Sequence, residues 1–219
     1  RFPQITCPSP ITRVVTPGTC GYTFTGPAAN PTFTNDNCPD FTVTHNYLSA
    51  PQNTTLVGAT FPVGTTTVLW TITDCGGLIG TCTVEITVLD NEDPAFIQCP
   101  SDIVVSNDAD ECGALVNWAE PLAEDNCDGV TVTQTTGDAS GSFFPVGTTT
   151  IEYEAEDAAG NTVTCSFTIT VEDNQLPDLD CGVSFATFGT NGGNCSYTVP
   201  GTGLDATFSD NCPGATLTN

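Results

Sequence analysis

The chain has almost no basic side chains. It holds no lysine, no methionine, two arginines and one histidine among 219 residues, against 26 acidic residues, for a net charge of −24. Without lysine, Schiff-base chemistry, a P-loop phosphate contact and a lysine–asparagine isopeptide cross-link are all excluded. Two arginines cannot line a phosphate backbone, so the sequence also predicts no nucleic-acid partner.

Long hydrophobic runs are absent as well. No apolar stretch approaches the ~18–20 residues of a membrane span, so no span is expected in this segment. No signal peptide is visible, which predicts a mature segment or an excerpt of a longer protein.

Cysteine, in contrast, is abundant, with 12 residues. A reducing cytosol would not keep so many bridged, so the chain is expected outside the cell or at the cell surface. Cys-x-x-Cys pairs that could hold zinc do not occur, and the single histidine, His45, has no catalytic motif around it. The sequence therefore predicts no catalytic residues and no enzyme.

Internal repeats organise the chain. Residues 61–68 (FPVGTTTV) recur as 144–151 (FPVGTTTI), and residues 82–88 (CTVEITV) recur as 165–171 (CSFTITV), each 83 positions later. The tripeptide Asp-Asn-Cys occurs three times and ends at Cys38, Cys127 and Cys212. These matches predict three domains: repeat one at 1–90, repeat two at 91–173, and the first half of a truncated repeat three at 174–219.

Each repeat has the pattern of β-strands. Residues 162–171 and 148–156 alternate apolar and polar side chains, the period of half-buried strands. Shorter runs that fit strands lie at 103–106, 112–118 and 130–135. Six or seven short strands in about 83 residues, with turn residues between them, predict an all-β fold of tandem immunoglobulin-like antiparallel β-sandwich repeats stapled by disulfides. Trp118 and Tyr153 are expected in its core.

The cysteines suggest a pairing scheme. Cys112 and Cys165 share strand faces with apolar residues, so both are expected to point into the core and to bridge the two sheets. Cys99 and Cys127 are expected in loops at the end of the domain where the chain enters it. Four cysteines allow three connectivities, of which first-to-third and second-to-fourth is favoured. The predicted bridges are Cys7–Cys38, Cys20–Cys82, Cys99–Cys127, Cys112–Cys165 and Cys181–Cys212.

Two cysteines have no partner under this scheme and are expected to be unpaired or intermolecular. Cys195 aligns with Cys112, and its expected partner falls beyond residue 219. Cys75 aligns with Ala158 in a hairpin turn. A covalent link to a neighbouring chain or repeat is one interpretation of Cys75, and a free or locally rearranged thiol is the other.

Six motifs in fixed order resemble the hyalin repeat (HYR) domain family. They are Cys-Pro, Cys-Gly-Ala-x-Val-x-Trp, Asp-Asn-Cys, Phe-Pro-Val-Gly-Thr-Thr-Thr, Asp-Ala-Ala-Gly-Asn and Thr-Cys-Ser-Phe-Thr-Ile-Thr-Val. The resemblance covers nearly all of repeat two, most of repeat one and the half-repeat at 174–219. It implies an immunoglobulin-like module of extracellular matrix and adhesion proteins, and the four-cysteine form with acidic linkers is similar to repeats in large bacterial surface adhesins. The family brings no enzymatic residues.

Acidic and amide side chains gather near the predicted joints between repeats. If the turns of one repeat face the preceding linker, their oxygens could supply Ca²⁺ with its 6–8 ligands at about 2.3–2.6 Å. The alternative is that these residues only cap turns and keep the surface soluble. Glu92 and Asp93 become Gln175 and Leu176 in the next linker, which leaves both interpretations open. The candidate calcium ligands are Asp90, Asn91, Asp93, Asp125, Asp157, Asp173, Asn174 and Asp210.

These features predict a non-enzymatic structural or adhesive module of an extended extracellular filament or cell-surface stalk. Its expected partners are neighbouring repeats, other copies in a fibre, and a surface glycan or protein ligand. The alternative is a carbohydrate- or protein-binding accessory module of a larger secreted protein. That module would need a cluster of exposed aromatic residues, whereas Trp70 and Trp118 both have inward parity. A receptor ectodomain directed at a host is a third hypothesis.

Overall fold

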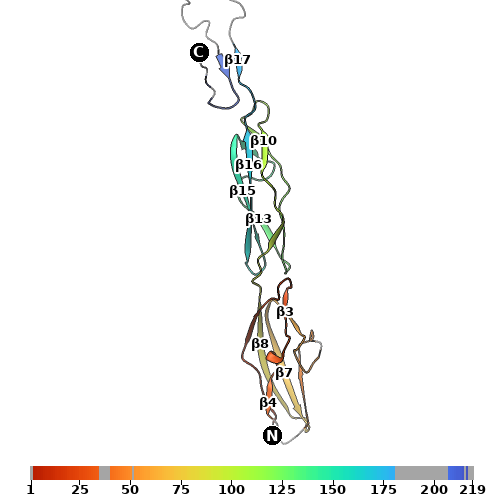
Figure 1. The fold of residues 1–219 in the computed structure, drawn as a ribbon. Helices are drawn as coiled ribbons and strands as arrows, with labels where there is room; N and C mark the ends of the chain where they lie inside the picture. The colour runs from red at the N-terminus through yellow and green to blue at the C-terminus, as the bar shows by residue number, and fades with distance from the viewer. Residues whose placement is uncertain (1, 35–39, 51, 181–206, 215, 217–219) are drawn as a thin grey trace, which may run out of the picture. The chain divides into compact units, whose positions relative to one another are not determined.

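The computed structural model describes residues 2–34, 40–50, 52–180, 207–214 and 216, and these residues form an all-β protein (Figure 1). The one helix among them is a single 3-10 turn, η1 (Pro27–Ala29). The strands are β1 (Gln4–Thr6), β2 (Ile11–Val14), β3 (Gly21–Thr23), β4 (Thr32–Thr34), β5 (Phe41–His45), β6 (Thr60–Pro62), β7 (Gly64–Asp74), β8 (Ile79–Leu89), β9 (Ala95–Gln98), β10 (Ile103–Ser106), β11 (Gly113–Leu115), β12 (Leu122–Glu124), β13 (Thr131–Thr136), β14 (Phe143–Pro145), β15 (Gly147–Glu156), β16 (Thr162–Glu172), β17 (Asp178–Asp180) and β18 (Thr207–Ser209). No helix in this part of the chain is long and apolar enough to cross a membrane.

The chain divides into two compact units. The first comprises Arg1–Gln98, Pro121–Thr133 and Tyr153–Cys165, and the second comprises Cys99–Glu120, Gln134–Glu152 and Ser166–Asn219. The division falls inside the second repeat. As a result Cys20 and Cys127 belong to the first unit, and Cys112 and Cys212 belong to the second.

The main sheet of the first repeat has the strand order β2-β8-β7-β5, and two short pairs, β1-β4 and β3-β6, accompany it. β7 and β8 form a long antiparallel hairpin in which Val68 lies opposite Val84 and Trp70 opposite Cys82. The residues that alternate with these on the other face are exposed or half-buried, namely Thr67, Leu69 and Thr71 in β7 and Thr83 and Glu85 in β8, so one face of the hairpin is apolar and buried. β2 joins the outer side of β8 in parallel.

Aromatic residues fill the core of the first repeat. Trp70 and Phe61 are fully buried. Tyr47 stacks on Phe61 with ring centroids 4.2 Å apart, and Phe24 meets Phe61 edge to face at 5.6 Å. The His45 ring packs against Trp70 at 4.8 Å, so this histidine is a packed strand residue.

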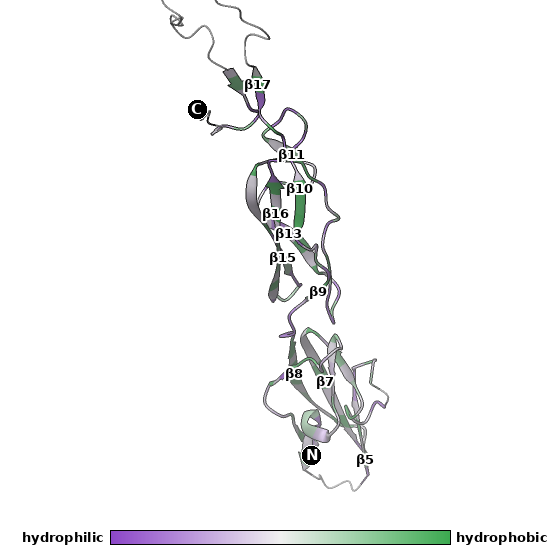
Figure 2. Ribbon diagram, turned by 45° about the horizontal axis from the view of Figure 1, so that its top comes forward, coloured by the Kyte–Doolittle hydropathy of each residue, from purple (hydrophilic) through white to green (hydrophobic). Residues whose placement is uncertain are grey.

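The second repeat reproduces this topology strand for strand. Its main sheet has the order β10-β16-β15-β13, and its short pairs are β12-β9 and β11-β14 (Figure 1). β10 joins β16 in parallel, as β2 joins β8. β10 is a hydrophobic strand (green in Figure 2), and its Val104 is 63% exposed at the edge of the sheet. β17 and β18 pair antiparallel, as β1 and β4 do in the first repeat.

The predicted alternation is confirmed in both long strands of the second repeat. Ile151 and Tyr153 are buried in β15, and Phe167 and Ile169 in β16. Trp118 is half-buried and packs against Phe167 with ring centroids 5.5 Å apart. The immunoglobulin-like sandwich class is therefore confirmed.

The strands differ from the sequence prediction in three respects. The strand expected at 112–118 spans only Gly113–Leu115, and the short pair β9-β12 was not expected. The parallel edge strands also make the main sheets mixed instead of purely antiparallel. Three- and four-residue strands carry too little alternation to be recognised from sequence.

Candidate functional site

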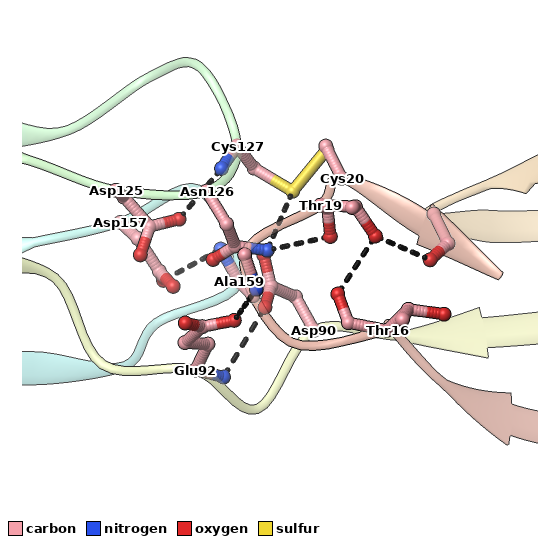
Figure 3. Close-up of a disulfide and its surroundings, with 12 residues drawn as sticks. Thr16, Thr19, Cys20, Asp90, Glu92, Asp125, Asn126, Cys127, Asp157 and Ala159 are labelled. Carbon is pink, nitrogen blue, oxygen red and sulfur yellow. Dashed lines mark hydrogen bonds between the residues drawn. A yellow bond between two sulfur atoms is a disulfide. The ribbon is translucent and has the colours of Figure 1, made fainter.

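A disulfide bond joins Cys20 of the first repeat to Cys127 of the second, 107 positions apart in the sequence (Figure 3). Cys20 lies at the end of a tight turn, directly before β3. The turn is closed at Thr16, whose carbonyl oxygen accepts bonds from the Thr19 backbone N–H at 2.9 Å and from its hydroxyl at 2.7 Å. Cys20 therefore belongs to the turn, and the inward and outward alternation of β3 does not fix the direction of its side chain.

Each residue of the Asp-Asn-Cys motif makes its own contact at this bond. The Asp125 Oδ2 atom accepts a hydrogen bond from the Cys127 N–H at 2.9 Å, which shapes the loop as an Asx turn. The Asn126 side-chain amide donates to the Thr19 carbonyl oxygen at 3.0 Å and lies 3.6 Å from the Cys127 Sγ atom. We call this set, Thr19 and Cys20 with Asp125, Asn126 and Cys127, the first latch.

The linker between the repeats is also hydrogen-bonded to this turn. The Glu92 Oε2 atom accepts a hydrogen bond from the Gly18 N–H at 2.9 Å. Gly18 has a φ of 73°, a left-handed conformation that glycine adopts without steric cost and that directs its N–H toward the linker. Asp90 in turn caps the linker, because its Oδ1 atom accepts from the Glu92 N–H at 3.2 Å.

A second latch repeats these contacts in the second unit. Cys112 is bonded to Cys212, 100 positions away. The Cys212 N–H donates to Asp210 Oδ1 at 3.3 Å, and the Asn211 amide donates to the Glu111 carbonyl oxygen at 2.8 Å. The same Asn211 amide lies 3.6 Å from the Cys212 Sγ atom. The second latch is therefore Glu111 and Cys112 with Asp210, Asn211 and Cys212.

The linker contact recurs as well. The Gln175 Oε1 atom accepts from the Asp110 N–H at 2.8 Å, and the Gln175 Nε2 atom donates to Asp110 Oδ1 at 3.1 Å. Asp110 has a φ of 64°, close to that of Gly18, and is the one non-glycine residue of positive φ in the described ranges. Aspartate tolerates this conformation better than most side chains do.

Asp157 holds the hairpin turn that faces the first linker. It is only 6% exposed, and its Oδ1 atom accepts from the backbone N–H groups of Ala159 at 2.9 Å and Asn161 at 2.8 Å. Burial raises its pKa, but bonds from the Asn161 side chain and from backbone N–H groups outweigh burial, and the pKa lies below its usual value. The Asn161 amide also donates to the Glu92 carbonyl oxygen at 3.2 Å, which ties the turn to the linker.

The predicted disulfide pairing is wrong. Cys7 is bonded to Cys82, and the latches take Cys20, Cys112, Cys127 and Cys212. These bonds exclude the predicted bridges Cys7–Cys38, Cys20–Cys82, Cys99–Cys127, Cys112–Cys165 and Cys181–Cys212.

Two local features explain the error. Cys112 precedes the first residue of β11, Gly113, so strand parity does not apply to it. In the first repeat, the chain before β1 approaches β8 so closely that a Cβ atom on Gly80 would lie 2.5 Å from the Pro3 carbonyl oxygen. That approach places Cys7 beside Cys82, whereas the predicted scheme paired Cys7 with Cys38.

The remaining six cysteines form two groups. Cys75, Cys99 and Cys165 are disulfide-bonded, so the prediction that Cys75 is an unpaired or intermolecular thiol is wrong. Cys38, Cys181 and Cys195 lie outside the described residues.

The structure brings together some of the candidate calcium ligands. One carboxylate oxygen each of Asp90 and Asp125 and the Cys127 sulfur lie within 4.8 Å of one another. The Cys127 sulfur is bound in the disulfide and is no thiolate ligand. The Oδ1 atoms of Asp125 and Asn126 are buried and accept no hydrogen bond, and the same holds for Asn211 Oδ1 in the second latch.

The other candidates have separate roles or positions. Asp157 holds its own turn, and Asn91 and Asp93 are exposed. Asp173 Oδ1 accepts from the Gln175 N–H at 3.2 Å, and the Asn174 amide donates to Ser106 Oγ at 2.9 Å. Asp210 is engaged in the second latch.

Tandem immunoglobulin-like sandwiches with disulfides between repeats define a class of extracellular repeat module. The HYR domain model matches residues 1–88 and 89–171, and the chain belongs to the HYR domain family. Hyalin of Lytechinus variegatus is 33% identical over 185 residues, which are 82% of this chain and 33% of that protein. The sushi repeat-containing protein SRPX2 of Homo sapiens is 37% identical over 89 residues, which are 40% of this chain and 19% of that protein.

The chain thus spans a third or less of the length of these relatives. They are extracellular proteins, and with its disulfides this chain is placed outside the cell or at the cell surface. Among solved structures, domains EC1-3 of Drosophila N-cadherin are similar, with 16% identity over 78% of this chain and 66% of that chain and a TM-score of 0.42.

Proposed function

We propose that this chain is a load-bearing segment of an extracellular filament or cell-surface stalk, built from tandem HYR repeats and without enzymatic activity. The observation that carries the proposal is the overlap of the two latch disulfides along the sequence. Cys112 lies inside the loop that Cys20–Cys127 closes, and Cys127 lies inside the loop that Cys112–Cys212 closes.

This overlap shortens the covalent path along the chain. From Cys20 to Cys212 the backbone runs for 212 − 20 = 192 positions, whereas the path through both disulfides uses only the 127 − 112 = 15 positions between Cys112 and Cys127. A pulling force at the ends is therefore carried by the disulfides and a short peptide. Such a path suits a stalk or filament that must keep its length under tension.

Single-molecule stretching of the full chain tests this proposal. At about 3.4 Å per residue, the fully extended path from Cys20 to Cys212 should span at most roughly 50 Å when oxidised and roughly 650 Å after reduction, and the released length is this span minus the folded separation. Equal release in both states would contradict the load-bearing role. A double variant, Cys20→Ser with Cys127→Ser, should release an intermediate length, because only one of the two bridges remains.

The proposal includes Ca²⁺ at the first joint. It is supported by the proximity of the Asp90 and Asp125 carboxylates and by the buried oxygens of Asp125 and Asn126 that accept no hydrogen bond. Oxygen donors of this kind suit Ca²⁺, and the ion would offset repulsion between the carboxylates. Gln175 and Leu176 replace Glu92 and Asp93 in the second linker. The second joint therefore carries two fewer negative charges, and weaker Ca²⁺ binding is expected there.

Calorimetric titration of the full chain with Ca²⁺ tests this part separately. Asp125→Asn should weaken binding, whereas Asp128→Asn, at an exposed neighbouring position, should not. No heat of binding at millimolar Ca²⁺ would show that these acidic residues only cap turns. That result would not contradict the covalent path through the two disulfides.

A surface glycan or protein ligand remains part of the proposal for an adhesive filament. A glycan array probed with the oxidised chain tests it. Strong, saturable binding to one glycan would favour the alternative, a carbohydrate-binding accessory module, over the load-bearing role.

A further inference from the structure

The two latches place one asparagine side chain in the same double contact. Asn126 donates to the Thr19 carbonyl oxygen at 3.0 Å, and Asn211 donates to the Glu111 carbonyl oxygen at 2.8 Å. In both cases the accepting residue directly precedes the partner cysteine. Both amide nitrogens also lie 3.6 Å from the sulfur of the cysteine that follows them.

We propose that this asparagine selects the partner of the latch cysteine. It docks the Asp-Asn-Cys loop on the turn before the disulfide forms, and it stabilises the thiolate of the cysteine beside it. Asn126 thereby directs Cys127 to Cys20, and Asn211 directs Cys212 to Cys112. The inference concerns disulfide formation and does not depend on the role of the chain in a filament.

Selection is needed because polymer statistics oppose the latch bonds. Cys20 and Cys127 are 107 positions apart, whereas Cys7 and Cys20 are separated by 20 − 7 = 13 positions. Closure of the longer loop is disfavoured about 20-fold relative to the shorter one. Contacts that form across the joint before oxidation can offset this factor.

The chemistry of the step uses both contacts of the asparagine. With glutathione disulfide as oxidant, the Cys127 thiolate attacks one glutathione sulfur, and the other glutathione leaves as a thiolate. The Cys20 thiolate then attacks the Cys127 sulfur of this mixed disulfide and expels the second glutathione thiolate. Two cysteine thiols lose two electrons and two protons, and one glutathione disulfide becomes two thiols.

Refolding of the reduced full chain in a glutathione redox buffer tests the proposal. After alkylation, mass spectrometry of the peptides would give the equilibrium constant of each disulfide. Asn126→Ala should lower that of Cys20–Cys127 by roughly fivefold to tenfold, the effect of a lost hydrogen bond, with Cys7–Cys82 and Cys112–Cys212 unchanged. Asn211→Ala should act on Cys112–Cys212 alone.

Asn126→Asp is the matched variant, because it keeps the shape of the side chain, removes the donor and adds a negative charge beside the sulfur. It should lower the equilibrium constant as Asn126→Ala does. It should also shift the pH profile of the Cys127 oxidation rate to higher pH. The proposal is overturned if both variants form Cys20–Cys127 with the constant and pH profile of the parent chain. Equal weakening of all three bridges in both variants would also overturn it.

Discussion

Glu92 and Gln175 stand at equivalent places in successive linkers and accept the same hydrogen bond. Glu92 Oε2 receives the Gly18 N–H at 2.9 Å, and Gln175 Oε1 receives the Asp110 N–H at 2.8 Å. A carboxylate and an amide can replace each other here, because the turn requires one side-chain oxygen at the right distance. The loss of charge at Gln175 is therefore compatible with an intact joint.

This equivalence predicts the effect of substitutions at Glu92. Glu92→Gln should preserve protection of the Gly18 amide, whereas Glu92→Ala should raise its exchange rate by roughly fivefold to tenfold, since one hydrogen bond is lost. Amide hydrogen exchange followed by NMR measures both. Equal exchange in the two variants would show that Glu92 does not hold the turn.

Removal of the Asp157 side chain should destabilise its hairpin turn. Asp157→Ala deletes the acceptor for the Ala159 and Asn161 N–H groups and should cost about 2 kcal/mol of unfolding free energy, as expected for bonds to a buried charged group. Urea denaturation measures the change. Asp128→Ala, at an exposed position, is the control and should leave stability within about 0.5 kcal/mol of the parent.

Asp157 should also make stability depend on pH. Its pKa is lower in the folded state, so the folded protein binds fewer protons, and the contribution of the charge is complete above the unfolded value of about 3.8. The contribution is lost as pH falls through the folded value. The stability gap between the parent and Asp157→Asn, from urea titrations, should therefore close below about pH 4, and a gap constant down to pH 2 would contradict this account.

Close approach of the chain at Gly80 should make that position intolerant of larger residues. Gly80→Ala places a methyl group 2.5 Å from the Pro3 carbonyl oxygen and 3.1 Å from Ile72 Cγ2, and we expect a cost of about 1–3 kcal/mol. Gly26→Ala is the matched control, because its Cβ would meet no heavy atom within 4 Å and its φ is −148°. Chemical denaturation should give a lower midpoint for Gly80→Ala than for Gly26→Ala. Equal midpoints would contradict the close approach of Pro3 to β8.

Strand alternation and internal repeats were sufficient to predict the fold class. The period of two in residues 148–156 and 162–171 is a local property, and the buried positions Ile151 and Ile169 follow from it directly. The pairing of cysteines is not local. Cys20 and Cys112 follow turns that remove them from strand parity, and their partners come from the next repeat along the chain.

A clue to these bonds was present in the sequence. Gly18 and Asp110 each stand two positions before a cysteine, and both adopt left-handed backbone that exposes an N–H to the linker. The Asp-Asn-Cys motif was recognised as a repeated element, but its amide contact joins residues 107 positions apart. Spacing within one repeat could not show that contact.

The most direct test of the disulfide between repeats uses the single Asp-Pro bond of the chain, Asp93–Pro94, which lies in the first linker. Mild acid cleaves Asp-Pro bonds preferentially and leaves disulfides intact. We predict that the cleaved, unreduced protein keeps the mass of the full chain plus one water, because Cys20–Cys127 holds its halves together, and that reductant separates residues 1–93 from residues 94–219. Separation of the two fragments without reductant would contradict the covalent latch.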